Sequence, residues 1–302
     1  MRPDLSVKVG PLKLKNPVIL ASGTFGKELS PLVNLNKLGA VVTKTITLKP
    51  RLGNPPPRVV EVPGGMINSI GLENPGLESF YREYLPWFKR INTVRIVSLA
   101  GESIQEYIEL AKSLDRARGI DALELNLSCP NVKRGGKVIA GSSAATAEVI
   151  KKVKRVIHRP IIAKLSPQVT DIVKIARSAR AAGADIIALI NTIPVMVIDW
   201  HTRKPCLGNV TGGLSGPCIR PLALKMVWEV ATQTDIPVIG IGGILEARDV
   251  LEFMVLGASA VAIGTATLIE PIVSLRIIKK LNNLLVIHKI KSVNQIIGTF
   301  QS

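Results

Sequence analysis

Aromatic side chains are scarce in this sequence of 302 residues, where Phe, Trp and Tyr together make up 4%. Proteins that bind single-stranded nucleic acid stack bases on such rings, so this chain offers few stacking platforms. No repeat, low-complexity stretch or linker interrupts the sequence either. We therefore expect a single domain over residues 1–302 and no nucleic-acid partner.

Cysteine is also rare, and the three present are Cys129, Cys206 and Cys218. An odd number of cysteines in a chain of this length does not indicate a disulfide framework. Their spacing matches no zinc or iron–sulfur motif. The sequence thus predicts no metal site on this chain and a reducing, cytoplasmic location.

The sequence lacks an apolar run long enough to predict a membrane span. The longest charge-free apolar stretch, residues 253–269, contains Gly257 and Gly264. A spanning helix needs about 20 predominantly apolar residues. Residues 1–4 do not lead into an apolar segment, so we expect no signal peptide. Neither feature favours association with a membrane.

Basic residues are abundant: 39 Lys and Arg against 22 Asp and Glu give a net charge of +17. They are widely spread, with modest clusters at residues 151–155 and 289–291. Nucleic acid, an acidic partner subunit, anionic ligands or simply a basic solvated surface would each account for this charge. The scarcity of aromatic residues disfavours the first of these.

Apolar residues make up 47% of the chain, and the mean hydropathy is +0.31. Parallel strands that are buried on both faces produce such values, because they read as continuous Val, Ile, Leu and Ala. Eight such runs alternate with helical patterns, which predicts an α/β protein with a (β/α)₈ TIM barrel; a doubly wound sheet is the alternative. The runs are residues 18–21, 40–44, 94–99, 122–127, 160–165, 186–191, 237–241 and 260–264, and the helical patterns are residues 103–118, 146–158, 170–182, 221–232, 246–256 and 271–281.

Three further features complete the predicted architecture. Residues 6–15 alternate apolar and polar side chains around Gly10, which predicts an N-terminal β-hairpin that plugs the barrel from below. Ser103 is a candidate N-cap for the helix that follows it. Residues 45–93 and 192–234 form long connections after predicted strands. Because such loops build the catalytic face of a barrel, we expect function there.

Polar residues stand where several predicted strands end, among them Lys44, Asn126, Lys164 and Asn191. In a barrel the carboxyl ends of all strands converge on one mouth. A hydrophobic core has no need of a ring of lysines and asparagines. A lysine at the mouth can neutralise an anionic ligand, so we expect a binding site there.

Glycines follow the last two predicted strands, at Gly242-Gly243 and at Gly264-Thr265. In barrels the loops after these strands often bind phosphate through backbone N–H groups. Glycine allows the backbone to approach the anion closely. We therefore predict a phosphate-binding site, although ordinary turns would use the same residues. No P-loop or dinucleotide fingerprint is present.

Cys129 follows the fourth predicted strand in a Ser-Cys-Pro-Asn turn, with Lys133 and Arg134 close behind. A free cysteine is usually an inert small hydrophobe. An electropositive, accessible loop instead lowers the pKa of a thiol toward the reactive range. A catalytic thiol is the hypothesis we favour.

The sequence Leu-Glu-Leu-Asn-Leu-Ser-Cys-Pro-Asn at residues 123–131 resembles the active-site strand and loop of dihydroorotate dehydrogenase. The resemblance covers nearly the whole chain and includes residues 43–45, 68–74 and 163–167. Residues 198–217 are similar to class 1B, the NAD-linked heteromeric form. The chain departs from the family pattern at Ser98, where an asparagine is usual, at Gln168, and at residues 138–144.

The resemblance implies FMN in the barrel mouth, dihydroorotate or orotate beside it, and Cys129 as the catalytic base. The implied FMN contacts are Ser22, Lys44, Thr45, Asn126, Lys164, Ile190, Gly216, Gly242, Gly243, Gly264 and Thr265. The implied pyrimidine contacts are Lys44, Asn68, Ser69, Ile70, Gly71, Leu72, Asn126, Asn191 and Thr192.

The resemblance also implies oxidation of (S)-dihydroorotate to orotate in de novo pyrimidine (UMP) biosynthesis, with a hydride passed to FMN. In class 1B the electrons reach NAD⁺ through a partner subunit that carries FAD and a [2Fe–2S] cluster. It implies a homodimer core within a heterotetramer. A tRNA-dihydrouridine synthase, another pyrimidine reductase and a non-enzymatic RNA- or partner-binding barrel are the alternatives.

Overall fold

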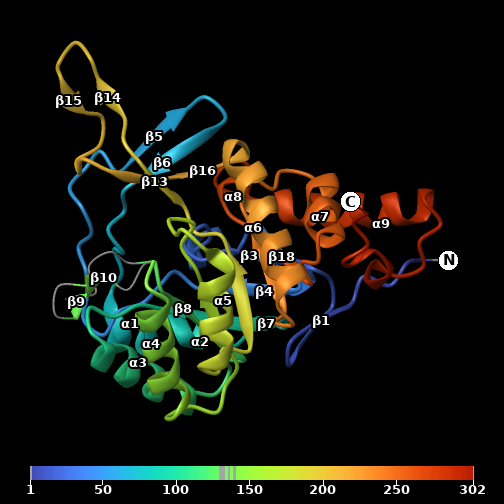
Figure 1. Cartoon of the computed structure of the whole chain (residues 1–302), viewed down its shortest axis with the longest axis horizontal. Coiled ribbons are helices and arrows are strands. Elements are labelled where there is room, and N and C mark those ends of the chain that lie inside the picture. The colour runs from blue at the N-terminus through green and yellow to red at the C-terminus, as the bar shows by residue number, and fades with distance from the viewer. Residues whose placement is uncertain (1, 129–132, 135–136, 139–140, 302) are drawn as a thin grey trace.

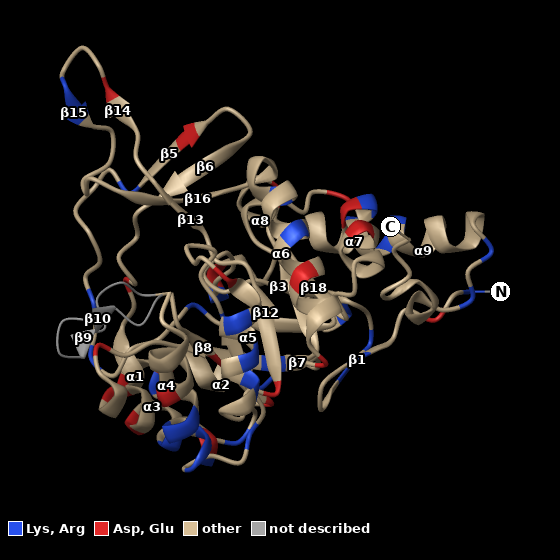
Figure 2. Cartoon of the chain, in the orientation of Figure 1, with Lys and Arg blue, Asp and Glu red and all other residues tan. Residues whose placement is uncertain are grey.

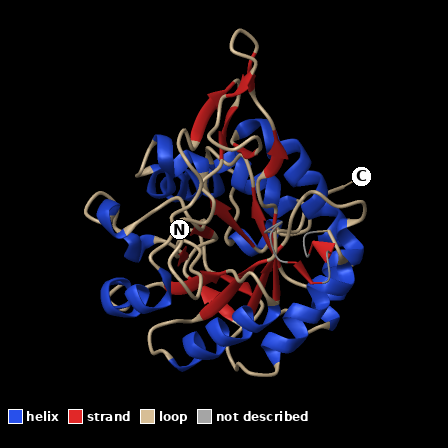
Figure 3. Ribbon diagram, turned by 90° about the vertical axis from the view of Figure 1, so that its left-hand side faces the viewer, coloured by secondary structure: helices blue, strands red, loops and turns tan. Residues whose placement is uncertain are grey.

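The computed structural model describes residues 2–128, 133–134, 137–138 and 141–301. Eight parallel strands form a closed barrel in the order of the chain, with the last strand pairing with the first. Helices surround these strands (Figures 1 and 3). The predicted (β/α)₈ barrel is therefore confirmed. Its strands are β3 (Val18–Leu20), β4 (Ala40–Val42), β7 (Val94–Leu99), β8 (Ala122–Asn126), β11 (Ile161–Lys164), β12 (Ile186–Leu189), β17 (Val238–Ile241) and β18 (Ala260–Ile263).

The barrel strands lie within the predicted apolar runs and are mostly shorter than them. Five of them, β3, β4, β12, β17 and β18, are apolar and buried along their full length. Two-faced burial explains this, because one set of side chains fills the barrel and the other meets the helices. The buried residues form one continuous core, which holds the strand ends in fixed positions.

Polar side chains cap the amino ends of several outer helices. Ser103 accepts a hydrogen bond from the backbone N–H of Glu106, as predicted. Ser142 caps the next helix, which therefore begins three residues earlier than its apolar pattern indicated. The helices of the outer layer are α3 (Ile104–Arg116), α4 (Ser143–Lys154), α5 (Ile172–Ala181), α6 (Arg220–Gln233), α7 (Ala247–Val255) and α9 (Val273–Ile287).

The predicted hairpin is also present, as β1 (Val7–Val9) paired with β2 (Leu12–Leu14). Gly10 makes its turn with φ +56°, and a Cβ there would lie 3.0 Å from the side chain of Ile186. Ile186 is the first residue of β12, so the hairpin covers the amino end of the barrel.

The two long connections after β4 and β12 meet over the opposite end. They contribute a four-stranded sheet in the order β13-β16-β6-β5, in which β16 pairs with β6. A two-stranded hairpin of β14 and β15 extends beyond it (Figure 1). The elements are β5 (Val59–Val62), β6 (Gly65–Asn68), α1 (Gly76–Ser79), a π-helical turn (Phe80–Tyr84), α2 (Leu85–Phe88), β13 (Ile193–Val195), β14 (Ile198–Asp199), β15 (Lys204–Pro205) and β16 (Gly212–Ser215).

Residues 253–269, the longest charge-free apolar stretch, divide among three elements. They are the end of α7, the strand β18 and a short helix, α8 (Thr265–Ile269). No helix in the described part of the chain is both long and apolar enough to cross a membrane. Two short antiparallel strands, β9 (Lys133–Arg134) and β10 (Lys137–Val138), follow β8.

Candidate active site

Side chains at the ends of five barrel strands meet in one hydrogen-bonded network at the carboxyl end of the barrel. The hydroxyl of Thr45 lies 3.1 Å from that of Ser22 and 2.9 Å from that of Ser98. The amide of Asn126 donates to Thr45 at 3.4 Å, and Asn191 donates to Asn126 at 3.1 Å. Four predicted site residues, Ser22, Thr45, Asn126 and Asn191, are thus brought together.

Lys164 ends β11 and lies beside Asn126 in the register of the barrel. It is 7% exposed, and its ammonium group makes no hydrogen bond or ion pair within the described residues. An unpaired buried cation is costly. A negatively charged or electron-rich ligand would offset that cost, so the position suits a binding site.

Lys44 lies at the rim and is more exposed. Its ammonium group is 3.6 Å from a carboxylate oxygen of Glu73, which also receives Arg58 at 3.0 Å. Sequence reasoning missed Glu73, because it follows the predicted pyrimidine segment without a pattern of its own. The ion pair connects the barrel rim to the long connection after β4.

The predicted pyrimidine segment, residues 68–72, leaves the end of β6. Asn68 donates to the carbonyl of Gly213 at 3.2 Å. Ser69 is 7% exposed and accepts a hydrogen bond from the amide of Asn54 at 2.8 Å. Ile70 accepts from the backbone of Asn54. Gly71 and Leu72 both have positive φ, at +74° and +56°.

Leu72 is the less usual of these last two, because a branched side chain rarely adopts positive φ. Such conformations persist only where surrounding contacts impose them. Here Asn74 donates from its amide to the carbonyl of Leu72 at 2.7 Å and so holds the segment.

Thr192 joins this segment to the barrel. Its backbone N–H donates to the side chain of Asn191 at 2.8 Å. A Cβ on Gly213 would lie 2.1 Å from the hydroxyl of Thr192, so the two residues are packed directly together. The carbonyl of Gly213 also accepts a hydrogen bond from Asn68. The predicted pyrimidine contacts Asn68, Asn191 and Thr192 therefore all lie near Gly213.

The two predicted phosphate segments, Gly242-Gly243 and Gly264-Thr265, both lie beside Gly216, which is another predicted FMN contact. Gly216 and Gly243 have φ of +105° and +71°, and a Cβ on Gly243 would lie 3.0 Å from the carbonyl oxygen of Gly216. Thr265 donates to Ser215 at 2.8 Å, which ties the start of α8 to the same place. Within the described chain, the backbone N–H groups of Gly243, Gly264 and Thr265 have no hydrogen-bond acceptor.

The remaining predicted FMN contacts are Gly242, with φ +134°, and Ile190, 2% exposed, whose backbone N–H donates to Ile241. Cys129, the predicted base, lies outside the described residues. Asn126, three positions before it in the sequence, stands in the mouth.

Glu124 is a second residue that sequence reasoning missed. It is 3% exposed, and one of its carboxylate oxygens has no hydrogen-bond partner within the described residues. It pairs in register with Ser98, which places both below the layer of Asn126. The sequence pattern that could have identified Glu124 is a charged residue inside an apolar strand run.

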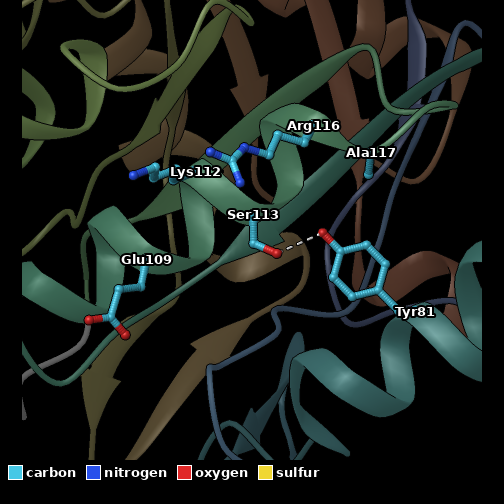
Figure 4. Close-up of a pocket in the computed structure, with 6 residues that line it drawn as sticks. All are labelled: Tyr81, Glu109, Lys112, Ser113, Arg116 and Ala117. Carbon is cyan, nitrogen blue, oxygen red and sulfur yellow. Dashed lines mark hydrogen bonds between the residues drawn. The ribbon is translucent and has the colours of Figure 1, made fainter.

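A shallow cavity of about 470 Å³ lies elsewhere, on the outer wall (Figure 4). Helix α3 and the π-helical turn form it, and Tyr81 and Ser113 hydrogen-bond within it at 2.9 Å. No strand end contributes to it, so it is separate from the mouth. Among the described residues, no group of three or more His, Cys, Asp or Glu could hold a metal ion.

Comparison with known proteins supplies the family. A model of the family described as dihydroorotate dehydrogenase matches residues 4–285. A protein of Thermodesulfovibrio yellowstonii named dihydroorotate dehydrogenase B (NAD(+)), catalytic subunit, is 52% identical over 301 residues, 99% of each chain. Proteins of the same name from Citrifermentans bemidjiense and Desulforudis audaxviator are 49% and 50% identical, covering 99% of this chain and 99% and 98% of their own.

Proposed function

This chain belongs to the dihydroorotate dehydrogenase family and is an oxidoreductase that acts on dihydroorotate, and we propose that it oxidises (S)-dihydroorotate to orotate with FMN in the barrel mouth. This reaction is a step of pyrimidine biosynthesis. The observation that carries the proposal is the meeting of Ser22, Thr45, Asn126 and Asn191, from four separate strands, beside the buried Lys164.

The mouth fits FMN at both ends of that molecule. A Cβ on Gly243 would lie 2.6 Å from the Cβ of Arg220, and a Cβ on Gly216 would lie 2.7 Å from the Cα of Gly65, so both positions require glycine. The N–H groups of Gly243, Gly264 and Thr265, which have no acceptor among the described residues, suit an anion such as phosphate. At the other end, the cation of Lys164, which pairs with no described residue, suits the electron-rich edge of a flavin ring.

When bound, FMN supplies the acceptor for the hydride that leaves C6 of dihydroorotate. Lys164 would hold the electron-rich edge of the ring, and Lys44 would offer a cation to the substrate at the rim. The amides of Asn68, Asn126 and Asn191 each offer a donor and an acceptor, as a pyrimidine's alternating groups require.

A positioned base must remove the proton at C5, because that hydrogen is only weakly acidic. We assign this role to the thiolate of Cys129. A cysteine has an ordinary pKa of about 8.5, which is nearer to working pH than that of a carboxylate. Asn126 and Lys164, whose positions are fixed by β8 and β11, would orient the substrate and cofactor, and Asn126 precedes Cys129 by three residues in the sequence.

We further propose that the electrons pass to NAD⁺ through a partner subunit with FAD and a [2Fe–2S] cluster. The named relatives support this, because they are called catalytic subunits of an NAD(+) enzyme. The net charge of +17 suits an acidic partner. A homodimer core within a heterotetramer, in the cytoplasm, completes the proposal.

Anaerobic mixing of the purified chain with dihydroorotate tests the function. We expect a yellow protein whose flavin absorbance near 450 nm bleaches on the addition of substrate, with release of one orotate per flavin. A colourless protein would favour the non-enzymatic barrel. A yellow protein that dihydroorotate leaves oxidised, but that binds tRNA or uracil, would favour a dihydrouridine synthase or another pyrimidine reductase.

A further inference from the structure

Asp249 is a buried carboxylate that connects two segments of the mouth. It lies on α7, 1% exposed, although it is not part of any predicted site. One of its oxygens accepts hydrogen bonds from the backbone N–H groups of Leu245 and Glu246, at 2.8 and 3.0 Å. The other accepts one from the guanidinium of Arg220. Asp249 therefore ties the connection after β17 to α6.

Arg220 is the first residue of α6 and stands four positions after Gly216. A Cβ on Gly243 would lie 2.6 Å from the Cβ of Arg220 and 3.0 Å from the carbonyl oxygen of Gly216. Gly243 is thus held between Arg220 and the Gly216 segment. Any displacement of Arg220 would change the spacing of the two glycine segments.

On the basis of the proposed function, we propose that Asp249 is a positioning residue for the phosphate monoester of FMN. Through Arg220 it fixes the separation between Gly216 and Gly243. Buried hydrogen-bond partners of this kind hold binding groups in place, and their loss weakens the ligand that those groups bind. The ring end of the site, at Lys164 and Asn126, lies on other strands and does not depend on this contact.

Helix capping alone does not account for the arrangement. Asp249 and Glu246 form a reciprocal capping box at the start of α7, which requires only contacts within that segment. The bond to Arg220 leaves the helix and reaches another element. A pure cap predicts a loss of stability that affects every ligand equally, whereas positioning predicts a loss specific to the phosphate.

Flavin-binding titrations of the apoprotein separate these roles. Quenching of flavin fluorescence gives Kd for FMN and for riboflavin, which lacks the phosphate. For Asp249→Asn we expect the Kd of FMN to rise by about 10- to 100-fold, while that of riboflavin changes less than about twofold. Arg220→Met should act in the same direction. Glu252→Gln is the matched control, because Glu252 lies 3.6 Å from Arg220 but is 39% exposed; it should leave both constants unchanged.

Each outcome decides the proposal. Equal weakening of FMN and riboflavin, or no weakening of either, would overturn it while leaving the proposed function intact. Should Asp249→Asn fail to fold, Arg220→Met supplies the same comparison. A wild-type chain that binds no FMN would instead contradict the proposed function.

Discussion

At the scale of single residues, Thr45 joins the most partners in the mouth. It is 6% exposed, and its hydroxyl meets Ser22, Ser98 and Asn126. At position 98 this chain has serine, whereas dihydroorotate dehydrogenases usually have asparagine. In this chain the serine hydroxyl closes the network through Thr45, so the substitution leaves no buried donor without a partner at that position.

Replacement of Thr45 by valine keeps the shape and removes the hydroxyl. We expect it to lower the free energy of unfolding by about 1–3 kcal/mol, because buried groups lose their partner, and to raise the Kd of FMN. Urea denaturation and fluorescence titration measure the two effects. Thr47→Val is the control: Thr47 is 4% exposed and bonds to Asn74 and Lys49. It should lower stability without changing FMN affinity; the same loss of affinity in both variants would contradict a specific role for Thr45.

The second prediction at the scale of single residues concerns the thiol of Cys129. Cys129→Ala should lower turnover by about 10²–10⁴, the range expected when a general base is lost, and FMN should remain bound. Stopped-flow reduction of the flavin by dihydroorotate measures the step. Cys218→Ala is the control, because Cys218 is exposed and, among the described residues, its thiol donates a hydrogen bond only to the carbonyl of Ser215, at 3.9 Å. Undiminished reduction in the Cys129 variant would remove the thiol from the mechanism.

At the scale of elements, Asp115 at the end of α3 fixes the connection between α4 and β11. Its carboxylate accepts from the backbone N–H groups of His158 and Arg159, both at 3.0 Å. Burial alone would raise the pKa of Asp115, but these hydrogen bonds and the Arg159 guanidinium lower it below its usual value. The junction that precedes Lys164 thus depends on an ionised carboxylate.

Asp115→Asn should lower the free energy of unfolding by about 1–2 kcal/mol at pH 7. Because folding lowers the pKa of Asp115, its contribution is complete above the unfolded value of about 3.9 and disappears as the pH falls through the lower folded value. The difference in free energy of unfolding between wild type and variant should therefore decrease below about pH 4. Urea unfolding across this range measures it. Asp235→Asn, at an ion pair whose carboxylate is 77% exposed, should change stability by less than about 0.5 kcal/mol. A difference that does not vary with pH would count against the ionic contribution.

The barrel elements were predictable because each has its own local pattern. Eight buried runs and six apolar helical patterns lie within one to four residues of the observed elements, apart from α9, which continues six residues beyond its pattern. The sheet over the mouth was not predicted. Its strands β6 and β16 pair across 145 residues, as the bond from Asn68 to Gly213 shows. No local periodicity encodes such pairing.

The residues of the candidate site were likewise predictable only in part. Strand ends such as Asn126 and Lys164 were predictable, because barrel geometry brings them together. Glu73 and Asp249 were not, since their roles depend on partners that only the folded chain supplies. Glu124 had only a local signal, a charged residue inside an apolar strand run.

At the scale of the whole molecule, charge and exposed apolar surface are arranged differently. Lysine and arginine are spread over the helices and loops (Figure 2). Large exposed apolar side chains gather on the connection after β12, where Met196, Ile198 and Trp200 are 59%, 57% and 73% exposed. This connection carries the hairpin that projects from the barrel (Figure 1). Clusters of exposed apolar residues commonly mark protein interfaces.

The hairpin should be covered by a second copy of the chain. Two strands of two residues each are marginally stable in water by themselves. The ring of Trp200 lies against that of His201 at an angle of 30°, with centroids 3.7 Å apart. Homodimers with a self-complementary interface are the commonest oligomers, so one exposed patch can meet its own copy. We expect the chain alone to sediment as a dimer.

Trp200→Asp combined with Ile198→Ser should shift that dimer toward monomer, because it replaces apolar contacts with charge at the patch. The Kd of FMN should stay within about twofold of wild type, since the barrel mouth is unchanged. Analytical ultracentrifugation across protein concentrations measures the shift, and Leu52→Ser, at a 90% exposed apolar residue outside the hairpin, is the control. A wild-type chain that is monomeric at every concentration would contradict self-association through the hairpin.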